Sequence, residues 1–271
     1  MQKLGLNVIV YSLTTIALFY VCFPFAWLMM TSVKPSSLIF RPDVLIFTPR
    51  MDSWIAVLFN SGVPGYALNS IIVGVVTVII SIGVGCPAAY SFSRFKTGGN
   101  KLRLVILSAE MIPPAILIVP LFLLAYKFRI LDSIWALIAA HTTFIVPIIT
   151  WFLIGFFEEV PKELEEQAMV DGLTRLKAFL WVVFPNIRPG LAAAAVFGFI
   201  LSWNDTFYAL MLTGGHSKTL PVAIAGYWTF RGVEISKMAV AMLLSVIPAL
   251  TAMVFVQKHF IRGLGSQGIK G

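Results

Sequence analysis

Long apolar runs separated by short polar segments dominate the pattern along this chain. A helix needs roughly 20 predominantly apolar residues to cross a bilayer. Six stretches meet this requirement, and they occupy residues 6–30, 68–92, 104–126, 134–157, 190–213 and 238–256. The pattern therefore predicts an all-α, polytopic membrane protein with six transmembrane helices.

Prolines fall inside several of these predicted spans. Proline lacks a backbone N–H and kinks a helix, and in a bilayer the freed carbonyls need partners from neighbouring helices or water. We therefore expect a bundle that encloses a cavity, although simple shaping of the helix explains any single proline equally well. The third span contains Pro113, Pro114 and Pro120, the fourth contains Pro147, and Pro24 and Pro248 interrupt the first and last spans.

The composition agrees with a membrane location. Mean hydropathy is +0.91, and charged residues make up 12% of the chain, against about 25% in soluble domains. The first apolar run is too long for the core of a signal peptide, so we interpret it as a retained span. The formal net charge is +8. Membrane proteins carry excess Lys and Arg on their cytoplasmic flanks, and this explanation is preferred to nucleic-acid binding.

The distribution of Lys and Arg predicts an orientation. If the N-terminus is cytoplasmic, the inner segments hold 12 of these residues and the outer segments hold 8. The bias is strongest in the loop 93–103, SRFKTGGNKLR, which has four basic residues and no acid. We therefore predict that both termini are cytoplasmic, as is the segment between the fourth and fifth spans.

That segment concentrates the carboxylates of the chain, because six of the 12 acidic residues lie within 158–171. Pro161 suits the first turn of a helix, and Gly172 suits a left-handed stop at its end. Thr174 can cap a second helix over 175–184, which Pro185 ends. An exposed helix–turn–helix without catalytic residues is typical of a docking element, and the alternative is an ordinary solvated loop.

Residues 166–190, EQAMVDGLTRLKAFLWVVFPNIRPG, closely resemble the EAA loop of ABC importer permeases. Gln167, Leu173 and Phe184 depart from the common pattern through changes of size on a packing surface. The matching residues are Glu166, Ala168, Asp171, Gly172, Pro185 and Pro189. Six further segments are similar to markers of the carbohydrate subgroup, and specifically to the smaller, six-span subunit of maltose-type importers. In chain order they read FPFAWLMMTSVKP, LNSIIVG, AAYSFSRF, MIPPAILIVPLF, SWNDTFYALML and GLGSQGIKG.

This resemblance implies a type I ABC importer permease fold, with residues 1–271 as a single transmembrane domain and a coupling loop at about 158–189. It implies a non-enzymatic subunit in the cytoplasmic (inner) membrane of a bacterium or archaeon, importing a sugar or sugar-like solute. The implied partners are a second permease subunit, two ATPase subunits that bind ATP and Mg, a periplasmic or extracellular solute-binding protein, and membrane lipid. No cofactor is expected in this chain. The tail 266–271 is implied to reach between the ATPase subunits. The implied ATPase-coupling residues are Glu166, Ala168, Asp171, Gly172 and Pro185.

Two carboxylates inside predicted spans, Glu110 and Asp205, are candidate functional residues because buried charge in a membrane is costly. Asp205 follows Trp203 and Asn204, and together these supply the aromatic and polar groups of a sugar site. Consecutive helix residues point about 100° apart, so all three cannot face one ligand. A gate or structural role and direct ligand contact both remain open for these residues. Weaker candidates are Met211, Tyr227, Trp228 and Phe230.

Two other classes of protein remain as alternatives. An ion-coupled secondary transporter would use Glu110 or Asp205 as its ion site. A membrane-embedded enzyme would need a convergent catalytic set, and none is present.

The histidines are widely separated, which argues against a metal site. Residues 213–220, TGGHSKTL, lack the spacing of a phosphate-binding loop and predict a turn. Cys22 and Cys86 lie in apolar runs and predict no disulfide.

Overall fold

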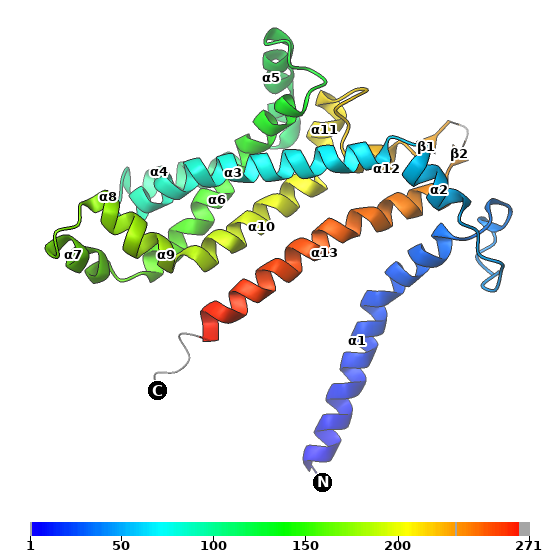
Figure 1. Ribbon diagram of the computed structural model, residues 1–271, viewed down its shortest axis with the longest axis horizontal. Coiled ribbons are helices and arrows are strands. Elements are labelled where there is room, and N and C mark those ends of the chain that lie inside the picture. The colour runs from blue at the N-terminus through cyan, green and yellow to red at the C-terminus, as the bar shows by residue number, and fades with distance from the viewer. Residues whose placement is uncertain (1, 231, 266–271) are drawn as a thin grey trace. The chain divides into compact units, whose positions relative to one another are not determined.

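The computed structural model describes residues 2–230 and 232–265, and within them it is mostly helical (Figure 1). Residues 266–271, with the predicted ATPase-contacting tail, lie outside the described part. Among the described residues, four helices are long and apolar enough to cross a membrane. They are α1 (Gln2–Ser32), α3 (Val63–Phe95), α6 (Ile134–Glu159) and α13 (Ile235–Gly265).

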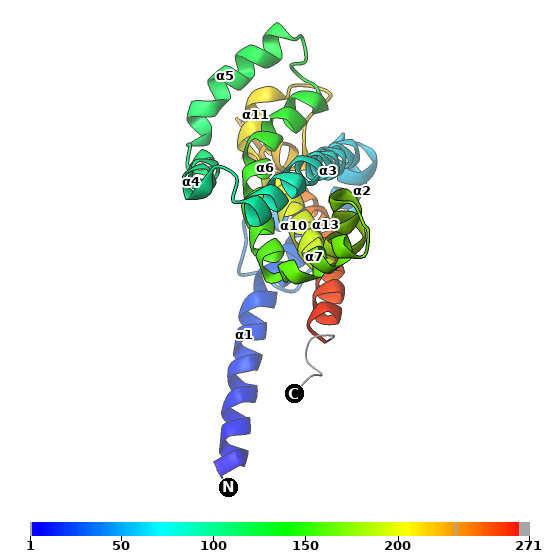
Figure 2. The same cartoon turned by 90° about the vertical axis from the view of Figure 1, so that its left-hand side faces the viewer.

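Two further candidate spans are bent pairs of helices. α4 (Gly99–Glu110) and α5 (Pro114–Lys127) meet at 84°, and Figure 2 shows this corner. Pro114 begins α5, so the predicted proline kink is a complete break. The helical run 175–186 meets α10 (Arg188–Asn204) at 71°. The count reaches six spans if each bent pair is one span.

Three details differ from the sequence-based expectation. α1 and α13 run through Pro24 and Pro248 without interruption. A proline removes a single backbone hydrogen bond, and in apolar surroundings the neighbouring turns have no competing partner. The predicted span 190–213 is not continuous, because α10 ends at Asn204 and α11 (Phe207–Leu212) begins after two residues. The side chain of Asp205 accepts hydrogen bonds from amides of α11 and so starts a new helix there.

One compact unit consists of residues 1–65 and 223–247. The proline-rich segment after α1 is folded, with the short helices η1 (Ser36–Leu38) and α2 (Asp52–Phe59). Lys34 is buried, and its Nζ donates to the carbonyl of Arg41 at 2.7 Å. The Trp54 indole donates to the Ser32 hydroxyl at 3.1 Å. The unit also contains the antiparallel hairpin β1 (Trp228–Thr229) and β2 (Gly232–Val233).

The described residues of the second unit are 66–222 and 248–265. α3, α6 and α10 share its main apolar core, in which Ala89, Phe157 and Ala194 are almost fully buried. α10 packs closely on α6. Gly190 makes this contact possible, because a methyl group at that position would overlap the ring of Phe156. A second core joins α5, α6, α11 and α12 (Leu220–Ala225).

Candidate functional site

The loop 158–189 contains the helix, the glycine turn and the second helix that its sequence predicts. α7 (Lys162–Val170) is followed by a turn at Gly172, whose φ of +93° is in the left-handed region. The amide of Leu173 donates to the carbonyl of Ala168, and the amide of Gly172 donates to that of Met169, both at 3.1 Å. This pair of bonds closes the helix in a Schellman motif. The Thr174 hydroxyl then caps the next helix by accepting from the Lys177 amide at 3.4 Å.

The second helix does not end at Pro185 as expected. It consists of α8 (Arg175–Ala178), a π-helical segment η2 (Phe179–Val183) and α9 (Phe184–Asn186). In the π segment the amide of Phe184 donates to the carbonyl of Phe179, five residues back. This shift in hydrogen bonding occurs just before Pro185, which has no N–H to donate, and the helix continues through Pro185 to Asn186.

Glu165 fixes the inner face of α7 to the end of α3. Its Oε2 lies 3.1 Å from Nε of Arg94, and the two side chains are 7% and 5% exposed. The Tyr90 hydroxyl donates to the other carboxylate oxygen. In the sequence, Glu165 stood out only as one of the six acidic residues within 158–171. Its partners Tyr90 and Arg94 lie four residues apart on α3, and no pattern in the sequence pairs them with Glu165.

Aromatic contacts extend this connection to the second helix of the loop. The ring of Tyr90 lies 4.6 Å from that of Phe179 and 5.6 Å from that of Phe157 at the end of α6. The Arg175 guanidinium lies 4.9 Å from the centre of the Phe95 ring. The loop is therefore packed firmly against the ends of two candidate spans.

The five predicted coupling residues divide between the two faces of the loop. Glu166, Asp171 and Gly172 are exposed, whereas Ala168 is 8% exposed and Pro185 is half-buried. The exposed face also carries two apolar side chains that sequence reasoning did not select, Leu164 and Val170, with exposures of 40% and 86%. The outer face is therefore mixed apolar and acidic, which suits contact with another protein.

A polar cluster stands at the break between α10 and α11. His141 of α6 is 1% exposed, its Nδ1 lies 2.7 Å from the Ser202 hydroxyl, and its Nε2 lies 3.2 Å from Asp205 Oδ2. Asp205 also caps α11 by accepting from the amides of Tyr208 and Ala209 at 3.4 and 3.1 Å. Asp205 therefore has a structural role. Sequence reasoning missed His141 because it considered histidines only as metal ligands.

A cavity of about 240 Å³ adjoins this cluster. Glu110, Asn204 and Asp205 line it together, from the end of α4 and the end of α10. Phe144 and Tyr208 line it as well, with their rings stacked at 5.6 Å. Three of the four candidate pathway residues therefore meet at one cavity. The fourth, Trp203, does not line it but is 3% exposed and stacks on Phe199.

The predicted turn at 213–220 is wrapped around a carboxylate. Asp132 Oδ1 accepts from the Gly214 amide at 2.8 Å and from the Ser217 hydroxyl at 2.6 Å, and Oδ2 accepts from the Gly215 amide at 3.0 Å. These donors, Ser217 first, hold the pKa of Asp132 well below its usual range. The amide of Asn69 donates to two carbonyls of the same turn. The glycines thus bind an anion, as in a phosphate-binding loop, but the anion belongs to this chain.

Comparisons with known proteins identify the family. The family described as "Binding-protein-dependent transport system inner membrane component" matches residues 78–266. The probable ABC transporter permease protein y4oR of Sinorhizobium fredii is 32% identical over 93% of this chain and 91% of its own length. The trehalose transport system permease protein SugB of Mycobacterium tuberculosis is 31% identical over 96% of both chains.

The fold recurs in a crystal structure of a bacterial ABC transporter involved in the import of the acidic polysaccharide alginate. One chain of that structure aligns with a TM-score of 0.76 and 20% sequence identity, covering 96% of this chain and 98% of that chain. These matches to transport permeases agree with the presence of helices that are long and apolar enough to cross a membrane. The chain therefore belongs to the inner membrane components of binding-protein-dependent transport systems, and it is a multi-pass ABC transporter permease, a transport component and not a catalytic subunit.

Proposed function

We propose that this chain forms half of the translocation pathway of an ATP-driven importer for a sugar or sugar-like solute. The observation that carries the proposal is the match over 96% of the chain to a trehalose transport permease. The family match favours this function over the ion-coupled secondary transporter that the two intramembrane carboxylates alone would allow.

We propose six spans in the cytoplasmic membrane, with each bent pair forming one of them and both termini in the cytoplasm. A second permease subunit completes the pathway. The most apolar part of α1, within residues 9–32, supports such a partner or a lipid contact, because none of its side chains is buried among the described residues. Two ATPase subunits bind ATP and Mg, and this chain supplies neither site.

The loop 158–189 is proposed as the coupling element. Its outer face, with Glu166, Val170 and Asp171, is exposed for contact with an ATPase subunit. Its inner face is held to α3 through Glu165 and Arg94. Closure of the ATPase subunits then moves the loop and the attached spans together. The ATP-bound state favours one bundle conformation only to the extent that it binds that conformation more tightly.

The cavity at the α10–α11 break is proposed as part of the solute pathway or its gate. Glu110, Asn204 and Asp205 offer hydrogen-bonding groups for hydroxyls, and Phe144 and Tyr208 offer apolar ring faces. This mixture is what a sugar requires. Asp205 also caps α11 and contacts His141. A solute that bound its carboxylate would weaken these contacts at the break between α10 and α11 and would thereby act on a gate.

Contact with the solute-binding protein is proposed for the unit that contains α2 and the β1–β2 hairpin. Phe40, Trp228 and Phe230 are strongly exposed there, with Trp228 at 76%. Phe40 and Phe230 line one cavity together with Gly232 and Glu234. Exposed aromatic side chains at this density are typical of protein interfaces.

The assembly can be tested by purifying the tagged chain from its native membrane in mild detergent and identifying what accompanies it by intact-complex mass spectrometry. The proposal expects a second permease and two copies of an ATPase. It also expects ATP-dependent solute uptake after reconstitution with the cognate binding protein. A stable single chain or homodimer that transports solute without an ATPase would contradict the proposal.

A further inference from the structure

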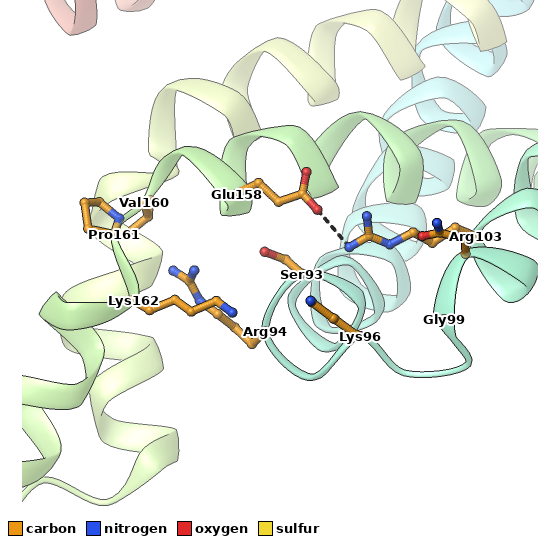
Figure 3. Close-up of a pocket in the computed structure, with 10 residues that line it drawn as sticks. Ser93, Arg94, Lys96, Gly99, Arg103, Glu158, Val160, Pro161 and Lys162 are labelled. Atoms are coloured by element: carbon orange, nitrogen blue, oxygen red, sulfur yellow. Dashed lines mark ion pairs between the residues drawn. The ribbon is translucent and has the colours of Figure 1, made fainter.

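A cationic cavity lies beside the coupling loop, where α3, α4 and α6 end or begin. Its volume is about 560 Å³, within the size range of small-ligand sites. Figure 3 shows side chains of all these segments around one space. The charged residues that line it are Arg94, Lys96, Arg103, Lys162 and Glu158.

The ion pairs leave this cavity with excess positive charge. Arg103 is paired with Glu158 at 2.8 Å, and Arg94 is paired with Glu165 at 3.1 Å. Lys96 and Lys162 have no ion pair among the described residues. Two positive charges therefore face the cavity without compensation, and a bound anion would neutralise them.

Two buried donors in the cavity wall also lack partners. Ser93 is 5% exposed and the Arg94 side chain is 5% exposed. Ser93 Oγ, Arg94 Nη2 and Arg94 Nε have no hydrogen-bond partner among the described residues, although Nε lies within ion-pair distance of Glu165. Figure 3 shows the polar ends of both side chains directed toward the segment that holds Glu158 and Lys162. An unsatisfied buried donor is costly, so these two groups indicate a missing acceptor.

The backbone adds a positive end to the same space. Lys96, Gly98 and Gly99 have φ values of 51°, 67° and 58°, so the chain makes a tight left-handed turn there. α4 starts at Gly99 and extends for 12 residues, and its first residues, Gly99 and Asn100, line the cavity. A helix N-terminus of this length presents free N–H groups and partial positive charge to an anion.

The position of the cavity identifies the kind of anion. It lies at the ends of α3 and α6, two candidate spans, and the ends of helices that cross a bilayer lie near the lipid headgroups. From the cavity, α4 continues with Leu104 and Val105, which are 59% and 60% exposed and can lie along acyl chains. We propose that this cavity binds the phosphate of an anionic phospholipid headgroup, with Lys96, Lys162, Ser93 and Arg94 as its contacts.

A lipid at this site would touch both the end of α3 and the start of α7. Arg94 contacts the proposed phosphate with one part of its guanidinium and Glu165 with another. Occupancy therefore stabilises the clamp that holds the loop 158–189, and the anionic lipid content of the membrane would influence how stiffly the loop is held. The stiffness of the loop depends on these contacts and not on the identity of the cargo.

The test is native mass spectrometry of the full-length chain titrated with dioleoyl phosphatidylglycerol or dioleoyl phosphatidylcholine. The double substitution Lys96→Gln with Lys162→Gln leaves both ion pairs intact. It should weaken phosphatidylglycerol binding about thirtyfold, because each lysine near an anionic lipid contributes roughly fivefold. The control, Lys101→Gln with Lys127→Gln, removes the same charge at positions that do not line the cavity. It should keep the wild-type preference for phosphatidylglycerol.

Inorganic phosphate is titrated in parallel to separate a lipid from a free anion. Retention of phosphatidylglycerol by the Lys96/Lys162 variant would overturn the proposal. Saturation of the site by millimolar phosphate, with no preference between the two lipids, would overturn the lipid assignment. Cross-linking of Lys162 to an acidic segment of a co-purified subunit, in place of bound lipid, would also overturn it. The thermal transition of each variant in phosphatidylcholine nanodiscs reports whether it is folded, and all variants should match wild type there.

Discussion

The carboxylate of Glu165 on α7 lies 3.1 Å from the guanidinium of Arg94 at the end of α3, and both side chains are nearly fully buried. This contact connects an exposed loop to a candidate membrane span. A buried ion pair adds little net stability but fixes geometry, and the loss of one partner is costly because the other charge stays buried. The loop and the end of α3 should therefore move as one body.

Glu165→Gln should release the loop. It leaves Arg94 buried without its counter-charge, and breaking such a pair costs about 3–5 kcal/mol. Limited trypsin digestion should cut faster at Lys162 and Arg175, and the thermal transition should fall. Glu163→Gln is the matched control, because Glu163 is exposed on the same helix and has no ion pair in the described part of the chain. Equal digestion of the two variants would show that the clamp does not hold the loop.

Changes at the glycine turn should separate ATP hydrolysis from transport. Gly172 has a φ of +93°, which proline cannot adopt, so Gly172→Pro distorts the turn. Asp171→Arg reverses an exposed charge and leaves the fold intact. In the assembled complex, both variants should insert normally and keep ATPase activity while solute uptake falls by about tenfold or more, equivalent to about 1.4 kcal/mol of lost coupling. Normal uptake by both variants would contradict the proposed coupling role of the loop 158–189.

Two glycines, one on α10 and one on α6, should respond differently to the same substitution. Gly190→Ala places a methyl group on the ring of Phe156 and should destabilise the protein by about 1–3 kcal/mol. A methyl group at Gly155 of α6 would meet no atom of the described residues within 4 Å, so Gly155→Ala should be neutral or stabilise the helix by about 0.5–1 kcal/mol. Thermal unfolding in detergent compares the two, and an equal loss from both would contradict the close packing of α10 on α6.

The stability of the turn 213–220 should depend on pH through the ionisation of Asp132. Its pKa is lowered by the Ser217 hydroxyl and by the amides of Gly214 and Gly215. A lowered pKa means that the carboxylate stabilises the turn at pH above its unfolded value of about 3.9, and that this stability is lost as the pH falls further through the folded value. Hydrogen exchange of the turn, corrected for the intrinsic rate, should therefore stay slow from pH 7 to about 4 and increase below about pH 4.

Asp132→Asn should reproduce the acid behaviour at neutral pH, since the amide cannot accept all of these bonds. Asp43→Asn is the control, because the pKa of Asp43 is lowered chiefly by its hydrogen bond with Arg41 and the residue is distant in sequence from the turn. Unchanged exchange in Asp132→Asn would mean that Asn69 alone fixes the turn.

Local chemistry predicted the parts of this fold that depend on neighbouring residues. Four of the six apolar stretches lie within single helices, and the other two, 104–126 and 190–213, are each divided between two helices. Gly172 and Thr174 end and start helices as their backbone preferences require. The break at Asp205 was not predicted, because the same residues read equally well as a continuous span until the capping bonds are seen. The partners of Glu165 and Asp132 come from distant segments, and a single sequence contains no direct signal for such pairs.

In the candidate site, too, features set by residues near in sequence could be predicted, and contacts between distant segments could not. Helical geometry indicated that Trp203, Asn204 and Asp205 could not share one ligand. In the structure Trp203 lies outside the cavity that the other two line. Their meeting with Glu110 depends on the 84° corner between α4 and α5. The prolines predicted a kink there, but neither its angle nor the side chains that it brings together could be read from the sequence.

Cysteine cross-linking tests most directly whether the outer face of the loop 158–189 contacts an ATPase. Val170→Cys, at an 86% exposed position, is placed in a Cys22→Ser background, because Cys22 is exposed and Cys86 is buried. In native membranes a short bifunctional thiol reagent should join Val170→Cys to an ATPase subunit, with a yield that changes when ATP is added. Lys127→Cys, at the end of α5, should give no such product. Absence of an ATPase adduct at Val170→Cys, or its reaction with a thiol reagent applied only from outside the cell, would contradict the coupling role of the loop.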